Sequence, residues 1–141
     1  MREHQNASDE ILDRLRSCCL SLPETVEERA WVGTRWRIRT KTFAHVVPID
    51  DGWPPAYVRA AESTGPLTVL TFRADVAVHG ALRGAGPPYV VPTWWPDIAG
   101  LVINEATDWD EVAELLTDSY TLLAPKRLVA KMEPFPDLRG R

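Results

Sequence analysis

The sequence predicts a two-layer α+β fold, in which helices pack on one face of an antiparallel β-sheet. Residues 34–48 alternate apolar and polar side chains with the period of two that is typical of a half-buried strand. Residues 8–21 and 107–120 instead repeat apolar side chains every three or four positions, as amphipathic helices do. The resulting order is helix, strands, helix, strands, helix, which is an α+β order with hairpin connections.

The chain of 141 residues suits a single domain, residues 1–141. Within it we expect a core of about residues 8–132 and a flexible tail at 133–141. Charged residues make up 26% of the chain and hydrophobic residues 45%, as in ordinary soluble globular proteins. No apolar run reaches the roughly 18 residues that a membrane helix needs. The polar start of the chain also lacks the apolar core of a signal peptide, so we expect a cytoplasmic protein.

The first predicted helix begins at Ser8, a good N-cap, and ends before Pro23. Its apolar face consists of Ile11, Leu15, Cys18, Cys19 and Leu22. The two cysteines are neighbours, and neighbouring side chains diverge on a helix, so a disulfide between them is not expected. We interpret them as reduced core residues, with a redox role as the lesser alternative.

The first two predicted strands form a hairpin with two different faces. Trp36 and Ile38 give it an apolar side. The alternating cations are Arg35, Arg37, Arg39 and Lys41, which we call the arginine row. A two-residue connection at positions 40–41 would place Ile38 opposite Phe43. The same register places Trp36 opposite His45 on the core side, and a slip of one residue would exchange the two faces.

The segments that link these elements are rich in acids and turn residues. Residues 23–33 are acidic, and we expect a solvated loop or a short turn there. Residues 49–66 form a long link in which Pro55 starts a short helix. Links of this length are often functional, so Trp53 and Tyr57 are candidates for the wall of a groove, with simple packing over the sheet as the alternative. Further extended segments are expected at residues 67–72, 89–91 and 100–104.

Two later helices are predicted from their terminal residues. Residues 74–84 have Asp75 near the start and Gly84 as the expected stop. The last major helix is capped by Thr107 or Asp108. Its predicted buried stripe consists of Trp109, Val112, Ala113, Leu116 and Tyr120.

The formal net charge of -4 conceals an uneven distribution of charge. No Lys or Arg occurs between Arg83 and Lys126, whereas this interval contains many acids. Cations gather in the hairpin and near the C-terminus instead. A generic polyanion-binding protein is usually basic overall, so any contact with nucleic acid would have to use a local patch.

Several short motifs, taken in order, resemble the MmcQ/YjbR family. They are Cys19-Leu20-Ser21-Leu22-Pro23-Glu24, Lys41-Thr42-Phe43-Ala44, Pro92-Thr93-Trp94, Glu114-Leu115-Leu116-Thr117-Asp118-Ser119-Tyr120 and Ala124-Pro125-Lys126-Arg127-Leu128. The resemblance covers about residues 8–132. It implies a two-layer α+β domain of CyaY-like or secretion-chaperone-like arrangement, with no catalytic residues, in a family often labelled DNA-binding. Two features depart from the pattern: Thr40 replaces a common glycine, and residues 92–97 lack the basic character of many relatives.

The arginine row is the first candidate functional site. Alternate residues of a strand lie about 6.6 Å apart, close to the spacing of successive phosphates in a nucleic-acid strand. The row could therefore follow a DNA backbone without reading bases. Two alternatives stay open: a merely polar outer face of the sheet, and self-association with the acidic C-terminal half of a second copy.

An aromatic groove for a small molecule or a protein is the second candidate site. Its predicted residues are Trp36, His45, Trp53, Tyr57, Trp94 and Trp95. The alternative for His45 is a packed, hydrogen-bonded residue without a ligand. Enzyme activity ranks third, because the sequence has neither a Gly-x-Ser-x-Gly elbow nor a phosphate-binding glycine loop. No metal or cofactor is expected, since the histidines and cysteines lack the spacing of ligands.

Overall fold

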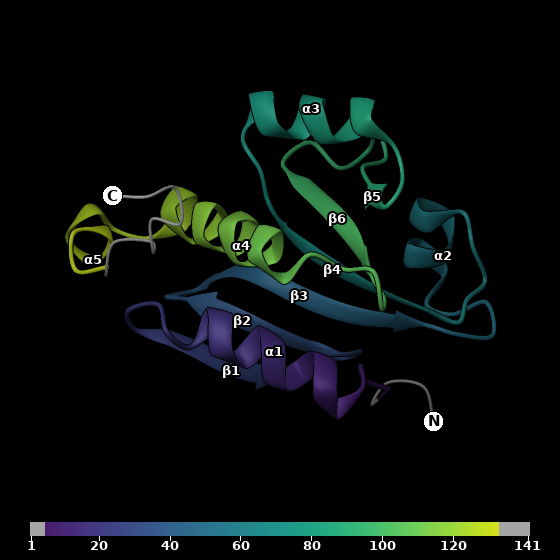
Figure 1. Cartoon of the computed structure of the whole chain (residues 1–141), viewed down its shortest axis with the longest axis horizontal. Coiled ribbons are helices and arrows are strands. Elements are labelled where there is room, and N and C mark those ends of the chain that lie inside the picture. The colour runs from purple at the N-terminus through teal and green to yellow at the C-terminus, as the bar shows by residue number, and fades with distance from the viewer. Residues whose placement is uncertain (1–4, 133–141) are drawn as a thin grey trace.

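The fold is built on a six-stranded antiparallel sheet (Figure 1). The computed structural model describes residues 5–132, so the tail expected at 133–141 lies outside the described residues. Across the sheet the strands are β1 (Thr25–Arg29), β2 (Thr34–Ile38), β3 (Lys41–Ile49), β4 (Leu67–Arg73), β6 (Ile98–Ile103) and β5 (Tyr89–Val90). The helices are α1 (Asp9–Cys19), α2 (Pro55–Ala61), α3 (Val76–Ala85), α4 (Trp109–Leu123) and α5 (Lys126–Val129). The predicted α+β class, with helices packed against an antiparallel sheet, is confirmed.

Side-chain caps fix where three of the helices begin. The Oγ of Ser8 accepts a hydrogen bond from a backbone N–H in the first turn of α1, at 3.3 Å. Asp75 and Asp108 cap α3 and α4 in the same way. The cap of α4 is therefore Asp108, one of the two residues predicted for it. The expected stop of α3 at Gly84 is wrong, because the helix continues to Ala85 and its C-cap is Gly86.

The hydrophobic core lies between the sheet and the helices α1 and α4, and α4 crosses β3 and β4 beside α1 (Figure 1). Trp36, Phe43 and Tyr120 are completely buried there. The ring of Tyr120 meets Phe43 edge-on, with 5.6 Å between the ring centroids. The Tyr120 hydroxyl donates a hydrogen bond to the backbone oxygen of Pro23, at 2.8 Å. The predicted core side of the hairpin, formed by Trp36, Ile38 and Phe43, is confirmed.

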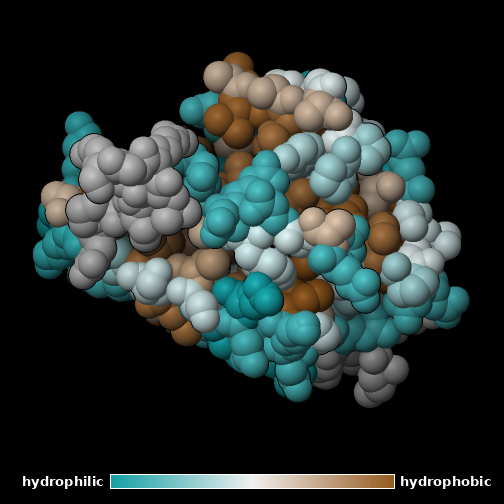
Figure 2. Space-filling view, in the orientation of Figure 1, coloured by the Kyte–Doolittle hydropathy of each residue, from teal (hydrophilic) through white to brown (hydrophobic). Residues whose placement is uncertain are grey.

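The outer surfaces of the helices differ in character. Figure 2 shows polar residues over α1 and α4, and hydrophobic residues over α3 at the top of the view. Val76 of α3 is 89% exposed. The buried residue of α3 is His79, whose ring nitrogen donates a hydrogen bond to the backbone oxygen of Trp95. Helix α3 thus fixes the loop that precedes β6.

The acidic segment at residues 23–33 contains the edge strand β1, so the prediction of a loop there is wrong. All five residues of β1 pair with β2. Glu27 of β1 accepts a hydrogen bond from the indole N–H of Trp36 and pairs with Arg16 of α1, each at 2.9 Å. An edge strand needs little apolar alternation, because solvent covers much of it. Because of its acidic residues, this segment resembles a solvated loop in the sequence, and the strand was not predicted.

The predicted turn of the hairpin is wrong by one residue. The connection consists of residues 39–40, one position earlier than expected, and Arg39 has a left-handed φ of 58°. Ile38 pairs with Lys41 instead of with Phe43. Lys41 therefore begins the return strand and does not continue the spacing of the three arginines.

A β-bulge then changes which residues of β3 face the core. Trp36 pairs with Ala44, and Phe43 is the extra residue between two paired positions. Both Phe43 and Ala44 reach the hydrophobic core. The prediction that His45 faces the core beside Trp36 is wrong, because His45 pairs with Arg35 on the opposite face. No residue type marks such a bulge in the sequence, so period two alone misplaced His45.

Candidate functional site

The face of the sheet turned away from α1 and α4, which we call the open face, carries the polar candidate residues. One row of paired residues crosses all six strands on this face. It consists of Glu28, Arg35, His45, Thr71, Gly100 and Val90. The row begins with an ion pair between β1 and β2 and places a histidine beside a threonine on the two central strands.

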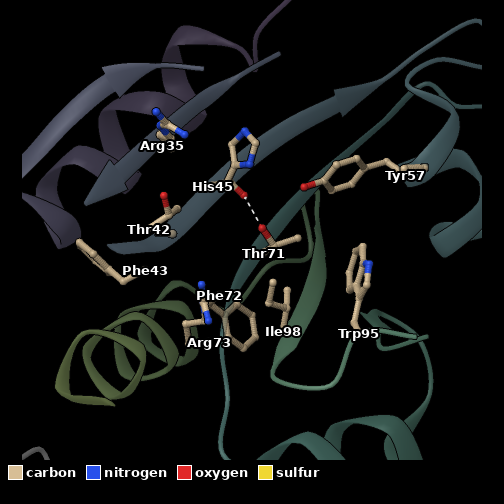
Figure 3. A pocket seen from close by; sticks show the side chains of 12 residues that line it. Arg35, Thr42, Phe43, His45, Tyr57, Thr71, Phe72, Arg73, Trp95 and Ile98 are labelled. Atoms are coloured by element: carbon tan, nitrogen blue, oxygen red, sulfur yellow. Dashed lines mark hydrogen bonds between the residues drawn. The ribbon is translucent and has the colours of Figure 1, made fainter. Parts of the chain in front are cut away.

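A groove of about 270 Å³ lies on the open face above β3 and β4 (Figure 3). It is lined by Arg35, Thr42, Phe43, Ala44, His45, Ala56, Tyr57, Thr71, Phe72, Arg73, Trp95 and Ile98. Tyr57 of α2 and Trp95 form an aromatic wall, with ring centroids 5.8 Å apart and planes at 64°. Figure 3 shows the hydroxyl of Tyr57 pointing toward Thr71 in the middle of the groove.

Local interactions hold both halves of this wall in place. Pro55 occupies the first turn of α2, where its missing N–H is not needed and its fixed φ suits the start of the helix. The ring of Tyr57 lies 6.3 Å from that of His45, edge to face. The loop that carries Trp95 is held by α3 and by an ion pair between Arg73 and Asp97 at 2.7 Å.

His45 is held as a neutral imidazole. Its Nε2 lies 2.9 Å from the backbone oxygen of Val32 and must donate, because a carbonyl oxygen can only accept. Burial is the main cause that lowers the pKa of His45, and the positive charge of Arg35 lowers it further. The hydrogen bond to Val32 acts in the opposite direction and raises this pKa. The side chain is therefore fixed in one tautomer at neutral pH, with Nδ1 as the acceptor.

The hydroxyl groups in the groove are protonated at neutral pH. Burial raises the pKa of Tyr57, and its hydrogen bond with Thr71 opposes this only in part. The Thr71 hydroxyl donates a hydrogen bond to the backbone oxygen of His45, at 3.2 Å. A ligand in the groove would therefore meet a neutral imidazole and neutral hydroxyl groups between two arginines.

Two glutamates pair with the three arginines of the hairpin. Glu28 of β1 forms ion pairs with both Arg35 and Arg37, the latter at 2.9 Å. Glu24 pairs with Arg39 at 3.2 Å. The hydrogen bond from Arg37 is the main cause that lowers the pKa of Glu28. Partial desolvation of the Glu28 carboxylate raises this pKa and so opposes the effect. Much of the positive charge of the arginine row is thus offset by neighbouring acids.

The structure brings three of the six predicted groove residues together and separates the others. The three that line the groove are His45, Tyr57 and Trp95. Trp36 is completely buried in the core, below the opposite face of the sheet. Trp53 is partly buried at the end of β3. Trp94 is half exposed, lies 4.9 Å from the guanidinium of Arg59, and borders a different hollow.

Three further groove residues, Thr71, Arg73 and Ile98, carried no functional signal in the sequence. Each belongs to a strand, and pairing between distant strands brings it to the groove: Thr71 lies opposite His45, and Arg73 lies opposite Ile98. The opposite charges of Arg73 and Asp97, at the facing ends of two neighbouring strands, are the one sequence feature that could have indicated this contact.

Other kinds of site find little support in the described part of the chain. Cys18 and Cys19 are free thiols, and burial raises the pKa of both, which disfavours the reactive thiolate. Within residues 5–132 no group of three or more His, Cys, Asp or Glu side chains could hold a metal ion. Among the same residues, no helix has both the length and the apolar character needed to cross a membrane.

These features define a small α+β protein whose sheet has one face packed by helices and one face partly open. The sequence model of the YjbR family matches residues 20–122, more than half of the chain, so the protein belongs to the YjbR family. The family predicted from the short motifs is thereby confirmed.

A solved structure agrees with this fold. The chain is similar to the Deinococcus radiodurans protein DR2400, which contains a DUF419 domain, with a TM-score of 0.58 and 18% sequence identity. The match covers 99% of this chain and 96% of that chain. At this identity the likeness shows the fold alone. No curated protein matches the sequence.

Proposed function

We propose that the protein is a non-catalytic binding module whose ligand is a small molecule held in the groove. The observation that carries this proposal is the composition of the groove. An aromatic wall of Tyr57 and Trp95 faces a few polar groups, among them the His45 imidazole and the Thr71 hydroxyl. Apolar walls with a few fixed polar groups are what small-molecule sites have in common.

The size of the groove favours a small ligand over a protein segment. Its volume of about 270 Å³ lies just below the range of roughly 300–1,000 Å³ for ligand pockets. The polar groups are also already engaged with the backbone: His45 donates to Val32, and Thr71 donates to His45. These bonds fix the side chains as recognition groups and leave no activated nucleophile among the described lining residues.

Loss of the Trp95 side chain is expected to weaken ligand binding in the groove. In a thermal-shift and tryptophan-fluorescence screen of small metabolites, bound compounds raise the Tm of the native protein by mass action. Trp95→Leu removes half of the aromatic wall, so we expect affinity for these compounds to fall about tenfold or more, equivalent to roughly 1.4 kcal/mol.

The neighbouring Trp94 supplies a matched control for this screen. Trp94→Leu changes the same residue type in the same loop, but its side chain borders another hollow. We expect this variant to bind as the native protein does. A screen without any binding compound, or an equal loss in both variants, would contradict the proposal.

Nucleic-acid binding through the arginine row is the second candidate function. It is favoured by the position of Arg35 and Arg37 on the open face. A phosphate would have to compete with Glu28 for both arginines, however, and that competition ranks this function below the groove.

Salt dependence tests this second candidate. Binding of a labelled DNA duplex or single strand at about 50 mM salt should weaken steeply as salt rises, with a shallower slope for Arg37→Ala. Glu28→Gln should strengthen binding, because it removes the carboxylate that competes for the arginines. Absence of binding to both DNA forms would exclude this function, and light scattering in the same buffers would reveal self-association through the row instead.

A further inference from the structure

The lining of the groove is positively charged in a protein that is negative overall. Among the described residues that line it, Arg35 and Arg73 are cations and none is an acid. The whole chain, by contrast, has a formal net charge of -4. Each of these arginines pairs with an acid outside the groove, so the groove offers an anion guanidinium N–H donors without a carboxylate in its own lining.

Three other hollows of the molecule are lined differently. The one between α3 and α4 includes Asp75 and Asp118. The one beside α2 and β5 includes Glu62, and the one between α1 and α4 includes Glu105. The absence of a lining acid therefore distinguishes the groove from these hollows.

Both guanidinium groups are held in place and retain unused donors. Arg73 donates from one terminal nitrogen to Asp97, at 2.7 Å. Arg35 donates from Nε, and pairs through NH2, with Glu28. Neither acid lines the groove. A guanidinium has five N–H donors, so each arginine can still offer donors to an anion, in a geometry that matches a carboxylate.

The aromatic wall adds a requirement for a flat ligand. The rings of His45, Tyr57 and Trp95 follow one another edge to face, at 6.3 Å and 5.8 Å. Flat ring faces and edges pack best against another planar group. With about 270 Å³ available, a single ring system fits better than a dinucleotide.

We propose that the groove takes a small planar carboxylate, with its ring against Tyr57 and Trp95 and its carboxylate on the guanidinium of Arg73. This inference rests on the proposed function, because it names the class of ligand for the same groove. Arg73 is the better of the two arginines for this contact, since its own ion pair uses a single guanidinium nitrogen, whereas Arg35 uses two on Glu28.

A pair of probes with the same shape and different charge tests the ligand class. Benzoate and benzamide are titrated into the isotopically labelled, full-length protein, and binding is followed by NMR shifts of the backbone amides and the tryptophan indole groups. We expect benzoate to bind at least about tenfold more tightly than benzamide, as charge-assisted hydrogen bonds predict. Arg73→Gln should remove this difference, while Arg83→Gln, at a cation that does not line the groove, should preserve it.

The outcomes separate the inference from the function on which it rests. Equal binding of benzoate and benzamide in the groove would overturn the carboxylate class and leave the proposed function standing. A preference for benzoate that survives in Arg73→Gln would overturn the role of Arg73. Acetate carries the carboxylate without the aromatic ring. If acetate binds as tightly as benzoate, the groove does not recognise the ring, and the planar part of the proposal is overturned. If neither aromatic probe binds and the metabolite screen is also empty, both proposals fail.

Discussion

Gly33→Ala is expected to destabilise the protein by roughly 3–5 kcal/mol, among the largest effects of any single substitution. Gly33 has a φ of 77°, in the left-handed region that alanine adopts only at a cost of about 1–2 kcal/mol. A Cβ at this position would also lie 1.8 Å from the backbone oxygen of Val46. The clash is with backbone, so no side chain can move aside to relieve it.

This substitution should also disturb the groove, because Gly33 follows directly on Val32. The Val32 oxygen is the acceptor that fixes His45, and a displaced loop would release the imidazole. Urea unfolding followed by circular dichroism measures the loss of stability. Gly84→Ala in α3 is the matched control: beyond the adjoining backbone of its own helix, no atom lies within 4 Å of the added Cβ, and a helical alanine should stabilise by up to about 1 kcal/mol. Equal stability of the two variants would contradict this account of the loop.

Ser119→Ala is expected to cost about 2–4 kcal/mol in the free energy of unfolding. The completely buried hydroxyl of Ser119 donates to the backbone oxygen of Phe43 at 2.6 Å and accepts from the backbone N–H of Arg73 at 2.8 Å. Alanine would leave one buried acceptor and one buried donor unpaired, each at roughly 1–3 kcal/mol. The serine joins α4 to the bulge of β3 and to the end of β4.

The same substitution should weaken ligand binding, since both backbone partners belong to residues that line the groove. NMR shifts of the Phe43 and Arg73 amides would report the change, together with urea unfolding. Ser17→Ala removes an exposed hydroxyl that donates to a helical carbonyl, and we expect it to change stability by less than about 0.5 kcal/mol. Should Ser119→Ala be as stable as Ser17→Ala, the hydroxyl would have no structural role at the bulge.

Much of the fold could be predicted from local sequence patterns. The helices α1 and α4 follow from their periodic apolar faces and from the caps Ser8 and Asp108, because these signals lie within a few residues of one another. The burial of Trp36 and Ile38 follows from alternation along one strand. Such features depend on near neighbours in the chain, which the sequence displays directly.

The features that were missed depend on contacts between distant segments. The edge strand β1 carries acids whose partners, Arg16 and Trp36, belong to other elements, so its sequence resembles a solvated loop. The bulge at Phe43 is a property of two paired strands. Because it reverses the direction of every following side chain, it moved His45 from the predicted core side to the open face.

In the candidate site, too, features that depend on residue type could be predicted, whereas features that depend on distant contacts could not. Aromatic residues could be selected as groove candidates by type, but only the fold separates Trp95 from its neighbour Trp94. Arg73 could not be selected at all, since its position in the groove depends on the pairing of β4 with β6. The positive charge of the arginine row was evident in the sequence. The ion pairs of Glu28 with these arginines could not be predicted, because they depend on the pairing of β1 with β2.

The most direct test of the central claim is to map where small molecules bind on the protein. Backbone-amide NMR spectra are recorded with each compound that raises the Tm. Binding in the groove predicts that the largest shifts cluster at Tyr57, Thr71 and Ile98, together with the Trp95 indole. Shifts that cluster at Trp94 and Arg59, or along the arginine row, with the groove amides unchanged, would contradict the claim.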